Sequence, residues 1–567
     1  MSIDLCNIPF STRGSYMAVS NMNADHPQAK YGQGLYIRSV RGKPVSRRTV
    51  CKLELLASDC HYNANETEIT ITAEHQKVQI CFHDPKTLLI KGNCPAELIV
   101  TQNAQGWGYD YAYKVDREQP LYILNLNRCN RKYIVQCLQG SISIQQNWEV
   151  ETSSDCKLLV SPTSGGFLLA LREMDTDRDI VPVELDYDVA LASMRQNFED
   201  FYSGFSHITD ESDLKRLAIY VLWSSIVAPS GKLKREAMYM SKNYMTSVWS
   251  WDHCFNAVAL GKAHAHLAME QFLIMFDTQD EAGMMADFVC DEGAVYNFCK
   301  PPVHGMMLSI ILQCHDYPKD VLQEIYIKLE KWTNFWLKYR MSGGLFEYHH
   351  GNDCGWDNSS VFAMGPLVKS PDAIAFLVLQ AEMLSQLAAK LDNHDGRKYW
   401  ERMSQELMEK LGLLYNENGF YALGEDNRRI TCDSLLLYLP IVLGQRLPDY
   451  MQASLLQGLQ RFETVFGYAT EALGSNAYIP DGYWRGPIWA PSAMIISEGL
   501  HALGEAELAF SLMSKFVMLI KNGGFAENFD AISGAGLRDN SYTWTASVYL
   551  YFLEKLQTMK EADLNEV

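Results

Sequence analysis

The strongest constraint on the fold is a change in the spacing of apolar residues near residue 186. Before this point, short alternating or continuous apolar runs are separated by polar turns, which is typical of β-strands. Six such runs are EITITA (68–73), VQICF (78–82), LYILNL (121–126), YIVQCL (133–138), SISIQ (141–145) and GFLLALRE (166–173). Runs that recur about every 8–12 residues indicate an antiparallel β-sandwich. We therefore predict a β-sandwich domain over residues 1–185.

A mixed, charged stretch at 186–210 is interpreted as a linker that carries a helix, and after it the spacing becomes helical. The candidate helices fall mostly into consecutive pairs: 211–229, 252–263, 264–279, 303–315, 317–341, 371–393, 394–414, 432–442, 448–463, 487–502, 505–522 and 541–560. Some are apolar on more than one face, as expected of inner helices in a double layer. These pairs predict an (α/α)6 barrel over 211–567, so the expected fold is an N-terminal antiparallel β-sandwich followed by an α-helical barrel.

Composition excludes several classes of partner. The 567 residues carry a net charge of −19, and an acidic surface repels a phosphate backbone, so we expect no nucleic-acid partner. No uninterrupted apolar run approaches the ~18 residues that a membrane span needs, and the N-terminus lacks the pattern of a secretory signal. The fourteen cysteines contain no CxxC pair, which favours reduced thiols and a cytoplasmic location. We predict no metal or other cofactor, and the oligomeric state stays open.

Four long loops between the predicted helices are unusually aromatic. They are YMSKNYMTSVWSWDHC (239–254), FEYHHGNDCGWDNSS (346–360), YIPDGYWRGPIWAP (478–491) and GGFAENFDAISGAGLRDNSYTWT (523–545). Long loops in a compact domain are usually functional. Aromatic rings beside charged and amide groups suit a sugar, whose C–H faces stack on rings while its hydroxyls form hydrogen bonds. The alternative is that these tryptophans only close the end of the helical domain.

Two acids in these loops are candidates for the carboxyl pair that glycoside hydrolysis needs. Asp357 follows Trp356, and a carboxyl desolvated by a ring has a raised pKa, which suits a general acid. Glu527 lies in GGFAENFD, where two glycines permit close backbone approach and phenylalanines make the surroundings apolar. Both acids could instead cap a turn or helix. Spacing alone does not rank four rival acids: Asp252, Glu347, Asp353 and Asp530.

The motifs WSWDHCFNA (249–257), GWDNS (355–359), YWRGPIW (483–489) and ENFDAISG (527–534) resemble those of the family 63 glycoside hydrolases, over about 300 residues. The resemblance implies an inverting exo-glycosidase on an (α/α)6 barrel preceded by a β-sandwich. It implies that Asp357 is the general acid and Glu527 the general base, while Asp252 and Arg485 hold the sugar. Further expected substrate-binding residues are Tyr244, Trp251, His304, Trp356, Asn358, Trp484 and Trp544. The sequence DAISG replaces the proline-containing turn expected after the base.

We therefore expect a cytoplasmic hydrolase that acts on a short α-linked glycoside, in the first place an α-glucoside. A mannosyl- or glucosylglycerate hydrolase is an alternative, as is a non-hydrolytic toroid, either a sugar epimerase or a carbohydrate-binding protein. The segment FSTRGSYMAVS (10–20) is polar, aromatic and poorly strand-like, so we expect it to line the entrance to the site.

Overall fold

The chain forms two compact units. The computed structural model describes residues 1–26, 28–43, 48–55, 59–102, 109–115 and 120–565. The N-terminal unit contains Met1–Ser203, Ile219–Pro229 and Ser241–Thr246, and the C-terminal unit contains Gly204–Ala218, Ser230–Met240 and Ser247–Val567. The chain thus passes between the units more than once. The functional boundaries at 185 and 210 stay a prediction.

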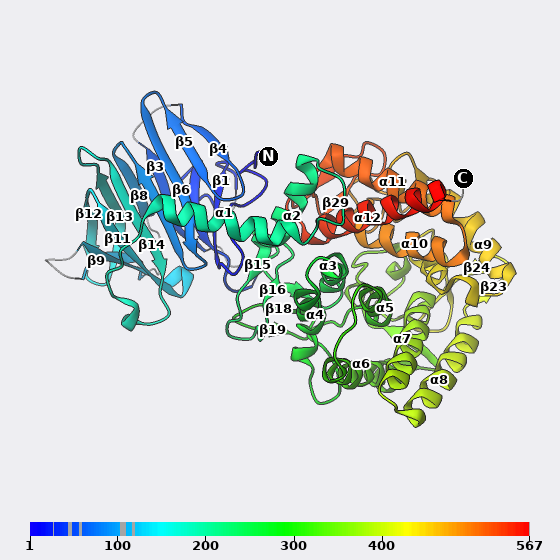
Figure 1. The fold of residues 1–567 in the computed structure, drawn as a ribbon. Coiled ribbons are helices and arrows are strands. Elements are labelled where there is room, and N and C mark those ends of the chain that lie inside the picture. The colour runs from blue at the N-terminus through cyan, green and yellow to red at the C-terminus, as the bar shows by residue number, and fades with distance from the viewer. Residues whose placement is uncertain (27, 44–47, 56–58, 103–108, 116–119, 566–567) are drawn as a thin grey trace. The chain divides into compact units, whose positions relative to one another are not determined.

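Two antiparallel sheets build the N-terminal unit (Figure 1). The six-stranded sheet has the order β1-β2-β3-β8-β13-β12, and the eight-stranded sheet has the order β4-β5-β6-β7-β14-β11-β10-β9. The strand bounds are β1 Met17–Met22, β2 Gly34–Ser39, β3 Thr49–Leu55, β4 His61–Ala64, β5 Ile69–Ala73, β6 Gln76–Asp84, β7 Thr87–Gly92, β8 Ala96–Thr101, β9 Tyr111–Lys114, β10 Leu121–Leu126, β11 Arg131–Gln139, β12 Ser141–Glu149, β13 Thr152–Ser161 and β14 Phe167–Glu173. All six runs that we predicted as strands are strands.

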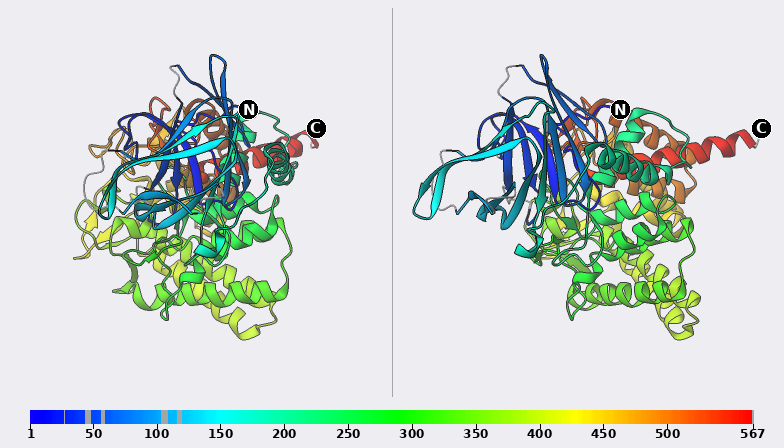
Figure 2. Two further views of the ribbon diagram at one scale, coloured as in Figure 1. Left: turned by 90° about the vertical axis from the view of Figure 1, so that its left-hand side faces the viewer. Right: turned by 60° about the vertical axis from the view of Figure 1, so that its left-hand side comes forward.

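The alternation of apolar and polar residues along a strand determines which face of the sheet is buried. In β5, Ile69, Ile71 and Ala73 are buried while the threonines between them are not, as a period of two requires. Helix α1 (Tyr187–Ser203) packs on the eight-stranded sheet through Tyr187 and Ala190, which join a core cluster with residues of β6, β7 and β14. Figure 1 shows α1 passing in front of the strands of this unit, and Figure 2 gives two further views of them.

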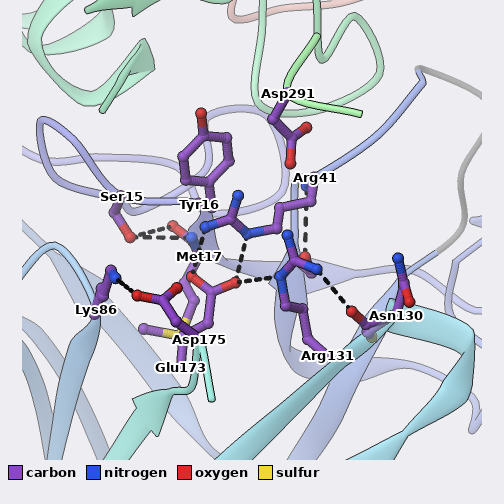
Figure 3. Close-up of polar contacts among 12 residues, drawn as sticks. Ser15, Tyr16, Met17, Arg41, Lys86, Asn130, Arg131, Glu173, Asp175 and Asp291 are labelled. Atoms are coloured by element: carbon purple, nitrogen blue, oxygen red, sulfur yellow. Dashed lines mark hydrogen bonds and ion pairs between the residues drawn. The ribbon is translucent and has the colours of Figure 1, made fainter. Parts of the chain in front are cut away.

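A buried charge cluster fixes the beginning of the chain (Figure 3). The Arg41 Nε donates a hydrogen bond of 2.5 Å to Glu173, and its guanidinium lies 3.7 Å from the centroid of the Tyr16 ring. Arg131 adds a second contact to Glu173, at 3.6 Å. Our prediction that residues 10–20 are poorly strand-like is wrong, because Met17–Met22 is the buried strand β1. In β1, apolar side chains are interspersed with small and polar ones, so the sequence pattern alone did not indicate a buried strand.

The C-terminal unit is mainly helical, and its helices agree with the predicted ranges to within a few residues. They are α2 Asp213–Ser225, whose last turns belong to the N-terminal unit, α3 Asp252–Leu260, α4 Ala265–Leu273, α5 His304–Cys314, α6 Lys319–Tyr339, α7 Pro371–Lys390, α8 His394–Gly412, α9 Asp449–Leu459, α10 Ala490–Leu503, α11 Ala506–Gly523 and α12 Thr543–Asn565. The exception is the predicted helix 432–442, which is the 3₁₀ segment η6 (Leu435–Arg446). Pro440 cannot donate a backbone hydrogen bond, and Gly444 has a positive φ of 55°, so an α-helix does not continue here.

Helix neighbours follow a closed order. Each member of the series α3, α5, α7, η6, α10 and α12 contacts the next, and α12 contacts α3 again. The helices α4, α6, α8, α9 and α11 each contact one or two members of that series.

Helix α7 is long and apolar enough to cross a membrane by length and composition alone, but 78% of its most apolar window is buried in the protein. That burial is typical of a core helix.

Short strands connect the helices in the loops. Their bounds are β15 Ile226–Val227, β16 Ala237–Met238, β17 Val248–Trp249, β18 Phe288–Val289, β19 Ala294–Val295, β20 Met341–Ser342, β21 Leu345–Tyr348, β22 Val368–Lys369, β23 Tyr415–Asn416, β24 Gly419–Phe420, β25 Ala422–Gly424, β26 Arg429–Ile430, β27 Glu463–Thr464, β28 Gly467–Tyr468, β29 Asn528–Phe529 and β30 Gly536–Leu537.

Candidate active site

Direct contacts bring the four aromatic loops together in the C-terminal unit. The Asn358 side chain donates to the carbonyl of Gly482 at 3.0 Å and accepts from the backbone N–H of Trp484 at 2.9 Å. Ile488 and Phe529 exchange two backbone hydrogen bonds, of 2.7 and 2.9 Å. Asn358 was predicted to bind substrate, and the structure shows that its amide joins two of the loops.

Five tryptophans from these loops pack against one another. Trp484 stacks on Trp489 at 4.0 Å and on Trp356 at 4.7 Å between ring centroids. Trp251 contacts Trp484 at 6.0 Å and Trp544 at 5.8 Å. None of the five is more than 3% exposed. The cluster therefore offers little open ring surface, and it holds the backbone of all four loops in one arrangement.

Two glycines allow the turn that carries Asp357. Gly355 has φ 75°, and a Cβ added there would lie 2.6 Å from the Trp251 ring. A Cβ on Gly351 would lie 2.2 Å from the carbonyl oxygen of Asp357. The glycine before Trp356 is thus required both by the left-handed backbone and by the close tryptophan. The following 3₁₀ turn is capped by Ser359, which accepts from the N–H of Val361, so Asp357 is not its cap.

Asp357 is half-buried, and desolvation raises the pKa of its carboxyl. The positive charge of Lys300 opposes this rise most strongly, and His350 opposes it less. The result is an acid held beside Trp356 with a raised pKa, the environment that the sequence predicted.

Glu527 is 6% exposed, and burial raises the pKa of its carboxyl to about 8. The negative charge of Asp539 adds to the rise, while Arg538 and a hydrogen bond from Tyr483 lower the pKa. Its backbone N–H donates to the carbonyl of Asp539 at 2.7 Å, which fixes the loop before β29. At neutral pH the free protein therefore holds a proton on Glu527.

Asp252 lies in the same site. It begins α3, is 3% exposed, and burial raises the pKa of its carboxyl to about 7. The charge of Asp357 raises the pKa of Asp252, and the charge of Asp252 raises that of Glu527. The charges of all three acids also raise the pKa of Tyr483. Because such effects need short distances, Asp252, Asp357 and Glu527 lie in one site around Tyr483.

Lys300 is a site residue that the sequence analysis missed. It is 4% exposed, pairs with Asp287 at 3.2 Å and donates to the carbonyl of Asn352 at 2.8 Å, on the loop that carries Asp357. It is the group that most lowers the pKa values of Asp357 and Asp252. The sequence feature that could have indicated this residue is a lysine within the otherwise uncharged segment FCKPPV (298–303).

Tyr483 and Arg538 were also missed. Both are non-glycine residues with positive φ, 63° and 67°, and the Arg538 guanidinium lies 4.9 Å from the centroid of the Tyr483 ring. Backbone strain of this kind concentrates at functional sites. Arg538 also pairs with Asp481 at 2.7 Å, which links two of the loops.

Other predicted residues have different surroundings. His304 begins α5, is fully buried and lies among Phe272, Phe276 and Trp332. Arg485 is half-buried, and its buried Nε has no hydrogen-bond partner. Tyr244 belongs to the N-terminal unit.

The rival acids are ranked by their contacts. Asp353 is 1% exposed and accepts hydrogen bonds from Arg340 and from the backbone of Cys299 and His349, so its role is structural. Asp530 closes a turn by accepting from two backbone N–H groups. Glu347 is 9% exposed, on β21, with His349 at 3.7 Å.

One compact group of metal-ligand type occurs in the described part of the chain. The potential ligand atoms of His253, Cys254 and His304 lie within 4.8 Å of one another, and all three side chains are buried. The Nδ1 of His253 is 3.0 Å from the carbonyl of Trp249, a contact that fixes the loop before α3.

The electrostatic role of Lys300 can be measured. We expect Lys300→Gln to raise the pKa of Asp357, so the limb of the kcat/KM profile that reports Asp357 should move to higher pH. Lys300→Arg keeps the charge and is the matched control. An unshifted profile in a folded Lys300→Gln protein contradicts this role.

The fold and the buried acids define a carbohydrate-active enzyme with a helical catalytic unit. The family model described as the mannosylglycerate hydrolase MGH1-like glycoside hydrolase domain matches residues 245–545. The chain belongs to this family of glycoside hydrolases, which confirms the resemblance to family 63.

Curated relatives match over short stretches. A mannosylglycerate hydrolase of Thermus thermophilus is 30% identical over 118 residues, which are 20% of this chain and 28% of the relative. Mannosylglycerate hydrolase MGH1 of Selaginella moellendorffii is 38% identical over 73 residues, 13% of this chain and 15% of the relative. A glucosylglycerate hydrolase of Mycolicibacterium hassiacum is 32% identical over 79 residues, 14% of this chain and 18% of the relative. The aligned stretches thus span less than a third of these relatives.

Solved structures share the fold. A mannosylglycerate hydrolase of Thermus thermophilus in complex with glucose has a TM-score of 0.53 at 18% identity, covering 60% of this chain and all of that one. A bacterial glucoamylase complexed with acarbose has a TM-score of 0.60 at 10% identity, covering 98% of this chain and 95% of that one.

Proposed function

We propose that this protein hydrolyses the glycosidic bond of a hexosylglycerate, a sugar linked to glycerate. The observation that carries the proposal is the group of Asp252, Asp357 and Glu527 around Tyr483, in which desolvation raises the pKa of each carboxyl. Two carboxyl groups are what glycosidic bond cleavage needs, one to protonate the leaving oxygen and one to activate water. The substrate class is supported by the curated relatives, which are mannosylglycerate and glucosylglycerate hydrolases. This was the alternative in our sequence analysis, and the relatives favour it over an α-glucoside.

Arg485 is the residue best suited to the charged part of such a substrate. Its half-buried guanidinium keeps an Nε without a hydrogen-bond partner. A guanidinium binds a carboxylate through two parallel hydrogen bonds, so Arg485 could hold the glycerate or, as the resemblance implies, sugar hydroxyls.

In the proposed mechanism Asp357 is the general acid and Glu527 the base that activates water. The pKa values alone would leave the proton on Glu527, so this assignment rests on the family motif. Glu527 becomes a base only after it loses its proton, while Asp357 must keep its own, so the two pKa values set the two limbs of the kcat/KM profile, with the limb of Glu527 at about 8. Asp252 would hold the sugar beside the two carboxyls.

The fold and location belong to the same proposal. The closed order of α3, α5, α7, η6, α10 and α12 supports an (α/α)6 barrel whose loops carry the site. A cytoplasmic location is supported by the cysteines, all fourteen of which lie in the described residues and are in the thiol form.

The substrate is tested by a panel. Purified protein is incubated with mannosylglycerate, glucosylglycerate and α-linked glucose disaccharides, and the released monosaccharide is measured. We expect kcat/KM for one hexosylglycerate to exceed that for the disaccharides by about 100-fold or more, because the half-buried Arg485 would have no carboxylate to bind in a neutral aglycone. A preference for the disaccharides would contradict the proposal.

An α-glucosidase is the second candidate function. The fold similarity to the glucoamylase extends over 98% of the chain, including the N-terminal strands, whereas the mannosylglycerate hydrolase structure covers 60%. The same panel separates the two candidates.

The stereochemistry tests the mechanism. An inverting pair leaves room for water, with a separation of about 6.5–9.5 Å between carboxyls against about 5–5.5 Å in a retaining pair. We therefore expect an α-linked substrate to release the β-sugar first. Proton NMR of the anomeric signals in the first minutes reads this out. Early appearance of the α-anomer would mean a covalent intermediate and would remove Glu527 from the role of base.

A further inference from the structure

The N-terminal unit contains a polar cavity of about 270 Å³. It is lined by Cys6, Ser20, Asn21, Met22, Asn23, Asp25, His26, Asn243 and Tyr244, all of which belong to this unit. The end of β1, the turn that follows it and the short segment 241–246 form its walls. The cavity lies outside residues 245–545, so the domain that the family model describes does not account for it.

The lining combines a ring with hydrogen-bonding groups. Tyr244 is 41% exposed and stacks on His26 with 5.4 Å between ring centroids. The His26 Nδ1 accepts from the backbone N–H of Gln28, which leaves Nε2 as the donor of the neutral ring. Ser20 is 5% exposed, and its buried hydroxyl has no hydrogen-bond partner. This hydroxyl lies behind the cavity wall, so the groups that face the free space are those of the more exposed lining residues, Asn23, Asp25, His26 and Tyr244.

The wall of this cavity is fixed in place by two buried basic side chains. Arg38, 1% exposed, donates to the carbonyls of Lys242 at 2.6 Å and Asn243 at 3.2 Å. The Lys242 Nζ, 2% exposed, donates to Ser11 Oγ at 3.0 Å and to the carbonyl of Ser15 at 2.6 Å, and burial lowers the pKa of this amine well below its usual range. A wall held this firmly loses little conformational entropy when a ligand binds.

The charge of the lining selects among ligands. Asp25 is the acidic residue of the lining, and neither lysine nor arginine is part of it. A carboxylate such as glycerate would lie beside Asp25 with no lysine or arginine in the lining to pair with, whereas hydroxyl groups can donate to the Asp25 carboxylate. Amides, an imidazole and an exposed tyrosine ring are the groups that bind pyranoses.

We propose that this cavity is a binding pocket for an uncharged hexose unit, with Tyr244 as the stacking surface and Asn23, Asp25 and His26 as hydrogen-bonding groups. The inference rests on the proposed function for its ligand class, because a glycoside hydrolase meets such sugars as substrate or product. It assigns the N-terminal unit a sugar-binding role of its own.

Cys6 provides a reporter that needs no enzymatic activity. It is the exposed cysteine of the lining, so a bound sugar should shield it from iodoacetamide. The Glu527→Gln protein, which cannot use Glu527 as a base, is alkylated with and without methyl α-glucoside or methyl α-mannoside, and peptide mass spectrometry follows each cysteine. Cys314 in the C-terminal unit is the internal reference.

We expect at least one neutral glycoside, at about ten times its Kd, to slow alkylation of Cys6 by about tenfold with Cys314 unchanged. Tyr244→Ala should weaken binding by about 2- to 10-fold, while Tyr450→Ala, which removes an exposed tyrosine of α9, should not. Asp25→Asn, which changes a second exposed residue of the lining, should weaken the binding of neutral glycosides and remove the discrimination against D-glycerate.

Three results would overturn the inference: no shielding of Cys6 by either glycoside, equal shielding in the Tyr244→Ala protein, or shielding by D-glycerate as strong as by the sugars. If the proposed function is wrong, the wild-type protein will hydrolyse none of the glycosides in the substrate panel, while the sugars still shield Cys6 in the Glu527→Gln protein. The two failures are therefore distinguishable.

Discussion

Replacing Asp357 with asparagine is expected to reduce kcat on natural glycosides by about 10²–10⁴-fold while the substrate still binds. The asparagine keeps the size of the side chain and cannot donate a proton to the departing oxygen. Since Asp357 is half-buried in a turn fixed by Gly351 and Gly355, the exchange should leave the loop in place. Steady-state kinetics and circular dichroism check both points.

The leaving group provides the decisive comparison. A glycosyl fluoride needs little protonation to depart, so the Asp357→Asn protein should hydrolyse it at a rate much closer to that of the wild type. The matched control is Glu527→Gln, which should lose activity on both kinds of substrate because water activation is needed in each case. If instead Glu527→Gln spares the fluoride and Asp357→Asn does not, the two carboxyls have exchanged roles, as the pKa of Glu527 alone would suggest.

Much of the fold could be predicted from the sequence because its elements are long and periodic. The alternation in 68–73 became β5, and the apolar run in SAMIISEGLHAL became the buried helix α10. The failures have local causes. Residues 17–22 were missed as a strand because small and polar residues share it, and η6 departs from an α-helix because of Pro440 and Gly444.

The candidate catalytic residues that lie within the sequence motifs could be predicted. Asp357 and Glu527 could be named from their neighbours, and the contacts that join the four loops are in keeping with one shared site. Lys300 could not be found this way, because its importance comes from three acids that are distant in sequence and close in space. Spacing also could not show that Asp353 is held by Arg340 or that Tyr244 belongs to the N-terminal unit.

The second large effect concerns Glu527→Gln, which should abolish most activity and yet stabilise the protein at alkaline pH. The folded protein raises the pKa of this carboxyl from 4.5 to about 8, so the folded state binds the proton more tightly than the unfolded state does. The stability that comes from this proton is fully present below pH ~4.5 and is lost as the pH rises through about 8. Glutamine resembles the protonated carboxyl at every pH and loses nothing.

At pH 8.5 the variant should therefore exceed the wild type by on the order of 3–5 kcal/mol in the free energy of unfolding, seen as a rise of several degrees in Tm. At pH 5 the two proteins should unfold at nearly the same temperature. Glu281→Gln, an exchange at an exposed glutamate, is the control and should show no pH-dependent difference. A Glu527→Gln protein that is less stable than the wild type at both pH values would mean that the carboxylate is favoured by its surroundings. The buried site would then already be ionised, and Glu527 would be ready to act as a base at neutral pH without first losing a proton.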